Sequence, residues 1–579
     1  MARATTKTHR PDLIATRHVA VAGHPWAATA AFAVLEAGGN AVDAGVAAGV
    51  ATDVLESEFV CFGGVAPSLV YMAEGDEMAV VAGIGTWPAA ASCAYFNDRF
   101  GGRVPPGVLR SVVPAAPDAW LTALERWGTM SFGDVAAAAI RFARDGFPMY
   151  PFMRDRIADK AKTIRGWPST AAIFLPGGGL PAVGDRFVQA DLAATLQYLA
   201  DEERAAAGKG GRAAGLKAAR EAFYRGDVAR AIVRFHESEG GLLSAADMAG
   251  YRVKVETPCR SRFGDIDLYG CGPWSQGPMV LQALALLERA GVAGMAPGGA
   301  EHLHAIAEAL KLAAADRESW FGDPEFVDVP VDALLSAGYL DRRVRRLDMQ
   351  TACPEMPPAG SVDGRRPRRW RADPSAQPAA PEPPPAETSF LCVVDGAGNV
   401  FASTPSDGTV TGPVVPGTGI IASQWGSRAY TDPAHPACVG PGRRPRMAAN
   451  PALAIAPGRF VMPFGSPGSE VLGQAMVQAF VNVAAFGMSP QEAVEAPRIA
   501  SYSWPGSAIP HAYAPGRLMV ERGVAPNAEK ALSARGHDVG RWPEQHWAAG
   551  SVAMIRVDLD SGLRIAGADP RRQAYAVGW

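Results

Sequence analysis

The chain has 579 residues, of which 48% are hydrophobic and 20% are charged, and its formal net charge at pH 7 is −3. This length exceeds what one small core needs and fits either several domains or one large intertwined fold. The near-neutral charge argues against a general role in binding nucleic acid or membrane surfaces.

The N-terminal segment contains no apolar core of the secretory kind. The richest apolar stretch, residues 41–54, is interrupted by Asp43 and Asp53, so it is too short and too polar to span a bilayer. We therefore expect a cytoplasmic protein that binds neither membranes nor nucleic acid.

The first part of the chain is expected to combine short strands with helices. Val19–Ala22 is a β-like run, Pro25 suits the first position of a helix, and Gly38-Gly39 suits the end of that helix. Asn40 is placed to cap the next helix, with Asp43 at its third position, where a carboxylate favours the exposed amides. The alanines and glycines of that helix would allow a close approach by a neighbour. Further strands are expected at Ser68–Met72 and Met78–Val81.

The middle of the chain, from about Val112 to Leu347, is expected to be mainly helical. Apolar residues recur there at three- and four-residue spacing. Two serine–aspartate pairs three residues apart, beginning at Ser131 and Ser244, are typical of helix caps. The expected helices are Pro117–Trp127, Ser131–Asp145, Val188–Glu203, Gly215–Ser238, Pro278–Ala290 and Ala300–Trp320.

Composition changes sharply between Pro354 and Glu387. Dense proline cannot build a helix or a strand ladder, so the segment is interpreted as an extended linker. The five arginines within residues 365–371 could form a nucleic-acid patch, but no face with interleaved aromatic residues accompanies them. A solvated linker is the favoured interpretation.

From Thr388 onward, alternating and β-branched residues predict a sheet-rich region. Strands are expected at Phe390–Val394 and Val400–Thr404, joined by a turn at Asp395–Gly398. A capping box with proline at the first helical position begins at Ser489. Further strands and helices are expected at Ala452–Ile455, Phe460–Pro463, Val552–Val557, Val471–Ala485 and Pro490–Ala496. Together with the helical middle region, this pattern indicates an α+β fold or a layered αββα arrangement.

Cysteine and histidine give no metal or redox motif in the sequence. The seven cysteines include no CxxC pair, which argues against a zinc ribbon or a redox dithiol and favours buried thiols. His302 and His304 are two residues apart in a helical pattern and so face different sides of the helix. No metal and no organic cofactor is expected.

The abrupt passage from the linker to a strand raises a chemical question about Thr388. A threonine hydroxyl is a weak nucleophile unless a base accepts its proton, and a freed α-amine on the same residue can be that base. The α-amine pKa of about 7.7–8.0 suits this role near neutral pH. The layout therefore predicts cleavage between Glu387 and Thr388.

Six short motifs resemble, in their order and spacing, the γ-glutamyltranspeptidase family of N-terminal nucleophile hydrolases. The set consists of GGNAVDA at 38–44, PGTGI at 416–420, GRRP at 442–445, FGSPGS at 464–469, EAVEAPR at 492–498 and GADPRR at 567–572. The resemblance spans about residue 18 to the end. It implies a four-layer αββα sandwich in which a helix-rich large subunit, residues 1–387, intertwines with a sheet-rich small subunit, residues 388–579.

The resemblance also implies roles for individual residues. TSFLCVVD aligns Thr388 with the nucleophile, and Ser406 with a hydroxyl residue that hydrogen-bonds it. Thr404, two residues earlier, would face the same side. The turn at Gly468 and Ser469 aligns with the one whose backbone amides form the oxyanion hole, a donor pair worth a few kcal/mol (roughly) in acyl transfer.

The substrate pocket departs from the family pattern. An arginine that binds the γ-glutamyl carboxylate is replaced by Ile84, an asparagine by Gly408, and the aspartate that binds the amine by Arg428, with Trp425 beside it. A Ser-Ser pair becomes Met447-Ala448. Losing buried polar partners should be costly for glutamate recognition.

The first hypothesis is therefore a self-processing amide hydrolase for a small acid, not specific for γ-glutamyl groups. The alternatives are a γ-glutamyl hydrolase or transpeptidase with a rebuilt pocket, and a family member that only binds. The expected partners are a small-molecule amide and the two subunits of one precursor. Assembly into a higher homo-oligomer is left open.

Overall fold

The computed structural model describes residues 8–368 and 387–579 and is dominated by two seven-stranded sheets in which neighbouring strands run antiparallel. The first sheet has the order β1, β20, β19, β15, β14, β10, β9, with bounds Leu13–Ala15, Arg564–Ala568, Ala553–Asp558, Phe460–Gly465, Ala452–Ala456, Ile266–Gly270 and Cys259–Phe263. The second has the order β21, β2, β11, β12, β4, β5, β8, with bounds Tyr575–Gly578, Val19–Ala22, Leu391–Val394, Val400–Ser403, Ser68–Met72, Glu77–Ala82 and Lys254–Glu256.

The two sheets pack face to face through their inward side chains. In β11, Cys392 and Val394 enter the core between the sheets, where they meet Leu453 and Ile555 of the first sheet. Leu391 and the other alternate residues of β11 face the helices instead. This two-residue alternation, with both faces buried, explains the continuous apolar run that the sequence shows here.

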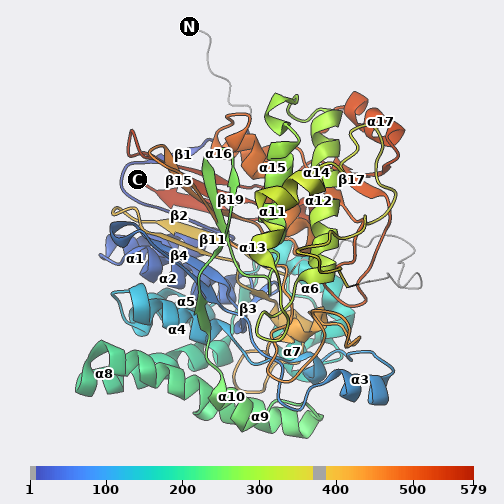
Figure 1. The fold of residues 1–579 in the computed structure, drawn as a ribbon. Helices are drawn as coiled ribbons and strands as arrows, with labels where there is room; N and C mark the ends of the chain where they lie inside the picture. The colour runs from blue at the N-terminus through green and yellow to red at the C-terminus, as the bar shows by residue number, and fades with distance from the viewer. Residues whose placement is uncertain (1–7, 369–386) are drawn as a thin grey trace.

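Helices cover the outer face of each sheet (Figure 1). On the side of the second sheet, α1, α2 and α4 lie against the strands and α5 and α8 pack on these helices, with bounds Pro25–Glu36, Ala41–Leu55, Ala116–Trp127, Phe132–Asp145 and Ala190–Tyr224. On the side of the first sheet, α11, α15 and α16 lie against the strands and α12 and α17 lie outside them, with bounds Gly277–Arg289, Leu472–Ala484, Pro490–Glu495, Ala300–Trp320 and Pro526–Ala534. The four-layer αββα sandwich expected from the sequence is confirmed.

The remaining elements are short or peripheral. The smaller sheets pair β13 with β3, β6 with β7, and β17 with both β16 and β18. The bounds of β13, β3, β6, β7, β16, β17 and β18 are Ser406–Asp407, Val60–Val65, Phe147–Pro148, Arg186–Phe187, Ile499–Ser501, Arg517–Glu521 and Asp538–Trp542. The other α-helices are α3, α6, α7, α9, α10, α13 and α14, with bounds Cys93–Phe100, Pro151–Ile164, Pro168–Phe174, Asp227–Glu239, Ala245–Gly250, Val331–Leu334 and Ala337–Val344.

Small residues let α2 sit tightly in the sandwich. A Cβ added to Gly45 would lie 2.1 Å from the Phe401 ring, and one added to Gly49 would lie 2.6 Å from the Trp120 ring. The close approach expected from the alanines and glycines of this helix is therefore confirmed. The Asn40–Asp43 capping box at its start is present as well.

Residues from before and after the expected cleavage point are interleaved in both sheets. In the second sheet β2 lies between β21 and β11, so an N-terminal strand is flanked by two strands from the C-terminal part. In the first sheet β1 pairs with β20, and β10 with β14. The two parts of the chain therefore share one core.

Three expectations need correction or limitation. The helices expected at Val188–Glu203 and Gly215–Ser238 are instead α8 and α9, because the alanine-rich stretch between them stays helical apart from a kink at Gly211. The strand expected to start at Thr388 starts at Leu391. Most of the expected linker, residues 369–386, lies outside the described residues.

Within residues 8–368 and 387–579, no helix is both long and apolar enough to cross a bilayer.

Candidate active site

Thr388 and Ser406 meet at one end of the second sheet, where the chain enters β11 and leaves β12. Thr388 Oγ1 lies 2.8 Å from Ser406 Oγ, and both residues are buried. Ser406 Oγ also donates to the carbonyl oxygen of Glu387 at 3.2 Å. One hydroxyl group thus touches both the hydroxyl expected to attack and the carbonyl oxygen of the bond expected to break.

The backbone at Thr388 is unusual for a β-branched residue. Its φ is 152°, in a region that costs such residues of order 1–3 kcal/mol (roughly). The neighbouring Ser389 amide donates to Pro405 O at 2.9 Å, which holds the segment beside the residues that precede Ser406. The chain therefore enters β11 in a conformation that surrounding contacts impose.

The turn at Gly468 and Ser469 follows β15 and also has a left-handed backbone. The φ angles are 130° and 52°, and Ser469 begins the 3₁₀ helix η8, Ser469–Val471, whose first amides have no partner within the helix. At the end of β15, a Cβ added to Gly465 would lie 2.2 Å from the Phe390 ring. This packing brings the turn close to the Thr388 segment.

A buried ion pair holds the residue after this turn. Glu470 accepts from Arg317 Nη1 at 2.7 Å and from the Ser507 amide at 2.7 Å. Burial opposes ionisation of Glu470, but these donors keep its pKa below the ordinary value. Sequence reasoning missed Arg317, because its partner lies far along the chain.

Arg428 lies on the 3₁₀ helix η7, Gln424–Arg428, and joins several of the predicted residues. Its guanidinium donates to Ser469 Oγ at 3.2 Å and lies 3.4 Å from Glu387 Oε2. It also lies over the Trp425 ring, 4.8 Å from the ring centre. Asp407, directly after Ser406, accepts from the Gln424 amide at 2.7 Å and so anchors the start of η7.

A second arginine near the same carboxylate was not expected from the sequence. Arg110 ends the 3₁₀ helix η2, Val108–Arg110, which packs against η7: a Cβ added to Gly426 would lie 2.4 Å from Arg110 O. Burial lowers the pKa of Arg110, while the charge of Glu387 raises it. The Glu387 carboxylate is therefore paired with Arg428 and also interacts electrostatically with Arg110.

The rest of the predicted pocket is apolar and tightly packed. Ile84, Trp425 and Met447 belong to one buried hydrophobic cluster. A Cβ added to Gly408 would lie 2.2 Å from Glu58 O, so an asparagine does not fit this backbone. Thr404 Oγ1 is buried and has no hydrogen-bond partner among the described residues, and no contact joins it to Thr388 there.

Behind the Thr388 segment lies a group of buried ionisable residues whose contacts with this segment were not expected from the sequence. Ser389 Oγ donates to Glu56 Oε2 at 2.6 Å, and Arg572 Nη1 donates to Thr388 O at 3.3 Å. Burial raises the pKa of Glu56 to about 7 and that of Glu58 to about 8. Burial also lowers the pKa of Arg572 to about 10.

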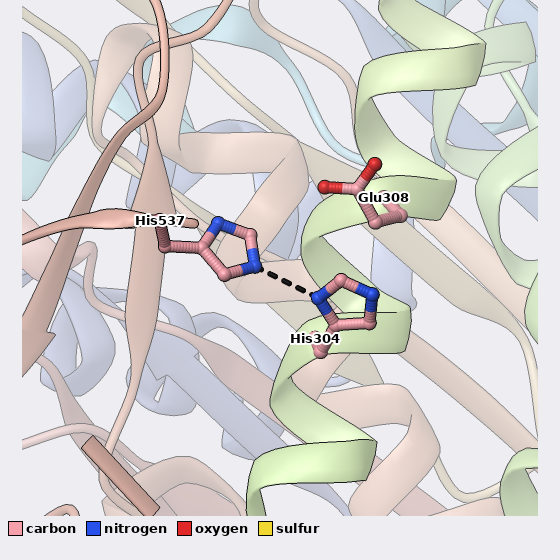
Figure 2. Close-up of side chains that lie close together, drawn as sticks. All are labelled: His304, Glu308 and His537. Carbon is pink, nitrogen blue, oxygen red and sulfur yellow. Dashed lines mark hydrogen bonds between the residues drawn. The ribbon is translucent and has the colours of Figure 1, made fainter. Parts of the chain in front are cut away.

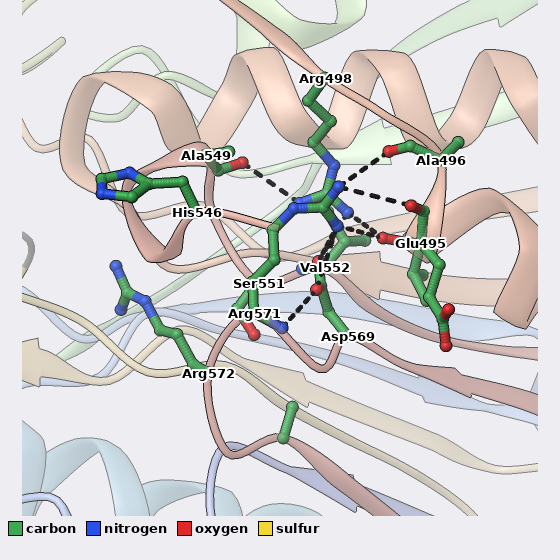
Figure 3. Close-up of polar contacts among 12 residues, drawn as sticks. Glu495, Ala496, Arg498, His546, Ala549, Ser551, Val552, Asp569, Arg571 and Arg572 are labelled. Atoms are coloured by element: carbon green, nitrogen blue, oxygen red, sulfur yellow. Dashed lines mark hydrogen bonds and ion pairs between the residues drawn. The ribbon is translucent and has the colours of Figure 1, made fainter. Parts of the chain in front are cut away.

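The GADPRR motif ends in two arginines with different surroundings (Figure 3). Arg571 bonds Asp569 and the Val494 carbonyl, and Arg498 bonds the same aspartate. Arg572 stands apart from this network in Figure 3 and turns toward Thr388 instead. The motif therefore combines a structural arginine with one at the site.

One His/Glu group among the described residues has ligand atoms within 4.8 Å of one another: His304, Glu308 and His537 (Figure 2). His304 Nδ1 lies 2.9 Å from His537 Nε2, and the other ring nitrogen lies 2.7 Å from Asp348 O. Lys311 Nζ donates to Glu308 at 2.7 Å, so its ammonium already neutralises the carboxylate. The arrangement fits a packing contact better than a metal site, and His302 takes no part in it.

Comparison with known proteins connects this geometry to enzymes. A family model described as Gamma-glutamyltranspeptidase matches residues 27–579. The chain is 31% identical to Acylase ACY 1 proenzyme of Pseudomonas sp. (strain SE83), covering 95% of this chain and 91% of that protein. It is 29% identical to the Glutathione hydrolase proenzyme of Escherichia coli (strain K12), with 93% and 87% covered. The crystal structure of cephalosporin acylase from Bacillus halodurans superposes with a TM-score of 0.82 at 26% identity, with 99% and 97% covered.

Proposed function

The chain belongs to the gamma-glutamyltranspeptidase family and is a hydrolase that acts on amide bonds, and we propose that it is a self-processing amidohydrolase with Thr388 as its nucleophile. The observation that carries this proposal is the double contact of Ser406 with Thr388 Oγ1 and Glu387 O, at 2.8 and 3.2 Å. The proenzyme names of its relatives support a precursor that is cut into a large and a small subunit.

Self-cleavage would begin with attack of Thr388 Oγ1 on the carbonyl carbon of Glu387. The hydroxyl proton passes to the Thr388 nitrogen, the carbon–nitrogen bond breaks, and an ester joins Glu387 to the Thr388 side chain. Water then hydrolyses the ester, which leaves a carboxyl group on Glu387 and a free α-amine on Thr388. The strained φ of 152° at Thr388 favours this step, because cleavage releases it.

Turnover of a substrate would reuse the same hydroxyl. The α-amine of Thr388 takes the hydroxyl proton and gives it to the departing amine, as in other N-terminal nucleophiles. Ser406 orients the hydroxyl, and the backbone amides of Gly468 and Ser469 stabilise the oxyanion. Water resolves the acyl-enzyme. Residues 1–387 and 388–579 would be the two subunits.

The position of the Glu387 side chain in the uncleaved chain suggests which acyl group a substrate carries. The carboxylate of Glu387 is at the end of a five-carbon chain that starts at the bond to be cleaved, and it lies 3.4 Å from Arg428 with Arg110 nearby. We propose that a substrate carboxylate takes this position after cleavage, since guanidinium groups bind carboxylates through paired hydrogen bonds. The buried cluster with Ile84 and Trp425 would contact its methylene groups.

A γ-glutamyl substrate is the alternative, supported by the glutathione hydrolase relative. Such a substrate carries an α-ammonium group at the far end of the same five-carbon chain. That ammonium would face Arg428 with like charge, which argues against it. The intact Thr388–Ser406 pair argues against a member that only binds. The cytoplasmic location and a higher homo-oligomer remain predictions.

Intact mass spectrometry of the purified protein, followed by a matched pair of anilides, tests the proposal. We expect fragments of 387 and 192 residues, and faster hydrolysis of a glutaryl anilide than of a γ-glutamyl anilide, which differs from it only at the α-ammonium and its carbon. A different cleavage point would refute Thr388 as the nucleophile. A γ-glutamyl kcat/KM of about 10⁴ M⁻¹s⁻¹ or more would refute the specificity.

A further inference from the structure

Cys93 and Cys438 are far apart in the sequence but meet in the fold. Cys93 is the first residue of α3, and its thiol donates to the carbonyl oxygen of Val439 at 3.2 Å. The Cys93 sulfur therefore lies beside the backbone of the residue that follows Cys438, and the two cysteine side chains interact. A contact between Asn97 of α3 and Thr431 O, at 3.1 Å, fixes the helix against the same segment.

The guanidinium of Arg443 contacts the sulfur atom of Cys438. Arg443 Nη1 lies 2.8 Å from Cys438 Sγ, and the guanidinium lies over the Phe326 ring. The neighbouring Cys93 side chain and the charge of Arg443 lower the pKa of Cys438 to about 6. A guanidinium on the Cys438 sulfur therefore favours its thiolate form, with Cys93 as the neighbouring thiol.

The other cysteines differ in this respect. Burial raises the pKa of Cys61, Cys259, Cys271 and Cys392. Cys93 is half-buried rather than fully enclosed, so small molecules in solvent can approach the pair from its side. A thiolate held by a cation next to a second thiol is the arrangement in which peroxide-sensitive cysteines are found.

We propose that Cys93 and Cys438 form a reversible disulfide when the protein encounters hydrogen peroxide. The Cys438 thiolate attacks one peroxide oxygen, the oxygen–oxygen bond breaks, and hydroxide leaves, so the sulfur becomes a sulfenic acid. The Cys93 sulfur, losing its proton, then attacks the Cys438 sulfur, and water leaves with the hydroxyl group and that proton. The two thiols lose two electrons and the peroxide gains two, and a dithiol reductant reverses the bond.

The disulfide would tie α3 to the segment that follows Arg428. Cys438 forms an isolated β-bridge with Tyr430, two residues beyond that arginine. If the chain is cut after Glu387, the same bond also joins the large subunit to the small one. This second consequence rests on the proposed function, whereas formation of the disulfide does not.

Hydrogen peroxide treatment of the full-length protein, followed by alkylation of the remaining thiols and peptide mass spectrometry, tests the pair. We expect a linked Cys93–Cys438 peptide with a loss of two hydrogen masses, reversed by dithiothreitol. In processed protein the two fragments should run as one band on a non-reducing gel and as two on a reducing gel. An uncleaved chain would still give the linked peptide, so failure of processing is distinguishable.

Three variants sharpen the outcome. Cys93→Ser should leave a sulfenic acid on Cys438 that dimedone traps, and Arg443→Gln should slow disulfide formation roughly 10-fold or more, because it removes the cation from the thiolate. Cys259→Ser, a matched half-buried cysteine, should react like the parent protein. Full alkylation of both thiols after peroxide, linkage of a different pair, or an unchanged rate in Arg443→Gln would overturn the inference.

Discussion

The nucleophile side of the site is made of residues at the ends of strands, whereas its acyl side is made of two short 3₁₀ helices. Thr388 and Ser406 belong to neighbouring segments of one sheet region, and their spacing in sequence is short. Arg428 and Arg110 come from η7 and η2, which are far apart in sequence and meet through Gly426. The proposed catalytic pair thus depends on two nearby strand ends, whereas the proposed substrate contacts depend on distant segments that packing brings together.

Thr388→Ala is expected to have the largest effect, because it removes the proposed nucleophile. Without the hydroxyl, neither self-cleavage nor turnover has a nucleophile, so one full-length band should remain and activity should fall at least about 10⁴-fold. Gel electrophoresis and an anilide assay measure both effects. Thr388→Ser is the matched control, since it keeps a hydroxyl and should still be processed. A processed and active Thr388→Ala protein would contradict the assignment.

Ser406→Ala tests the same side less severely. The variant keeps the nucleophile but loses the contacts with Thr388 Oγ1 and Glu387 O. Processing and turnover should both slow by about 10²–10⁴-fold while the fold is retained. Time courses of cleavage and steady-state assays of pre-processed protein separate the two steps. Ser406→Thr should restore part of both rates, and unchanged rates in the alanine variant would assign no role to this hydroxyl.

Arg428→Ala tests the acyl side without touching the nucleophile. Losing a charge-assisted hydrogen bond of about 1.5–3 kcal/mol should lower kcat/KM for a glutaryl anilide roughly 10- to 100-fold, mainly through KM. A pentanoyl anilide, which lacks the carboxylate, is the matched substrate and should lose much less. Equal losses on both substrates would mean that Arg428 supports the Ser469 turn rather than the substrate.

Glu56→Gln is expected to have the smallest effect, a change in how the melting temperature depends on pH. Glu56 accepts a hydrogen bond from Ser389, the residue next to Thr388. Burial raises the pKa of Glu56 from 4.5 to about 7, with Ser389, Arg572, Glu58 and Tyr150 around it. A raised carboxyl pKa means that stability is fully present below about pH 4.5 and is lost as the pH rises through about 7.

Glutamine keeps the hydrogen bond to Ser389 but does not ionise. The melting temperature of Glu56→Gln should therefore fall less than that of the parent between pH 5 and pH 8, by about 3 °C. Thermal melts at several pH values measure the difference. Parallel melting curves for the two proteins would show that Glu56 does not titrate in this range.

Elements with strong local signals were predicted well from the sequence. The strands Val19–Ala22 and Ser68–Met72 have the expected bounds, and the capping boxes at Asn40 and Ser489 are present. Alternation, capping side chains and proline act within a few residues, so they can be seen without the fold. The break expected near residue 204 was wrong, because helix propensity in the alanine-rich stretch outweighed its glycines.

Within the candidate site, too, some residues were predicted from sequence motifs and others were found only in the structure. The Thr388–Ser406 pair and the Gly468–Ser469 turn follow from motifs, and Arg428 from a departure within one. Glu56 and Arg110 carried no usable signal, since a lone charged residue shows neither its burial nor its partner in the sequence. Arg572 belongs to the GADPRR motif, but the motif did not indicate its contact with Thr388. Their positions beside Glu387 and Thr388 depend on elements that are joined only by packing.

By itself, then, the sequence determined the layered α+β fold, the family and the position of the expected nucleophile, because periodicity, caps and ordered motifs are properties of the linear chain. Only the tertiary structure decided what surrounds Thr388, and it changed the interpretation of the cysteines. The absence of a CxxC motif argued against a redox dithiol, yet α3 brings Cys93 to Cys438 and the GRRP motif adds Arg443. Charge and reactivity depend on distance in space, and a folded chain sets that distance independently of separation along the sequence.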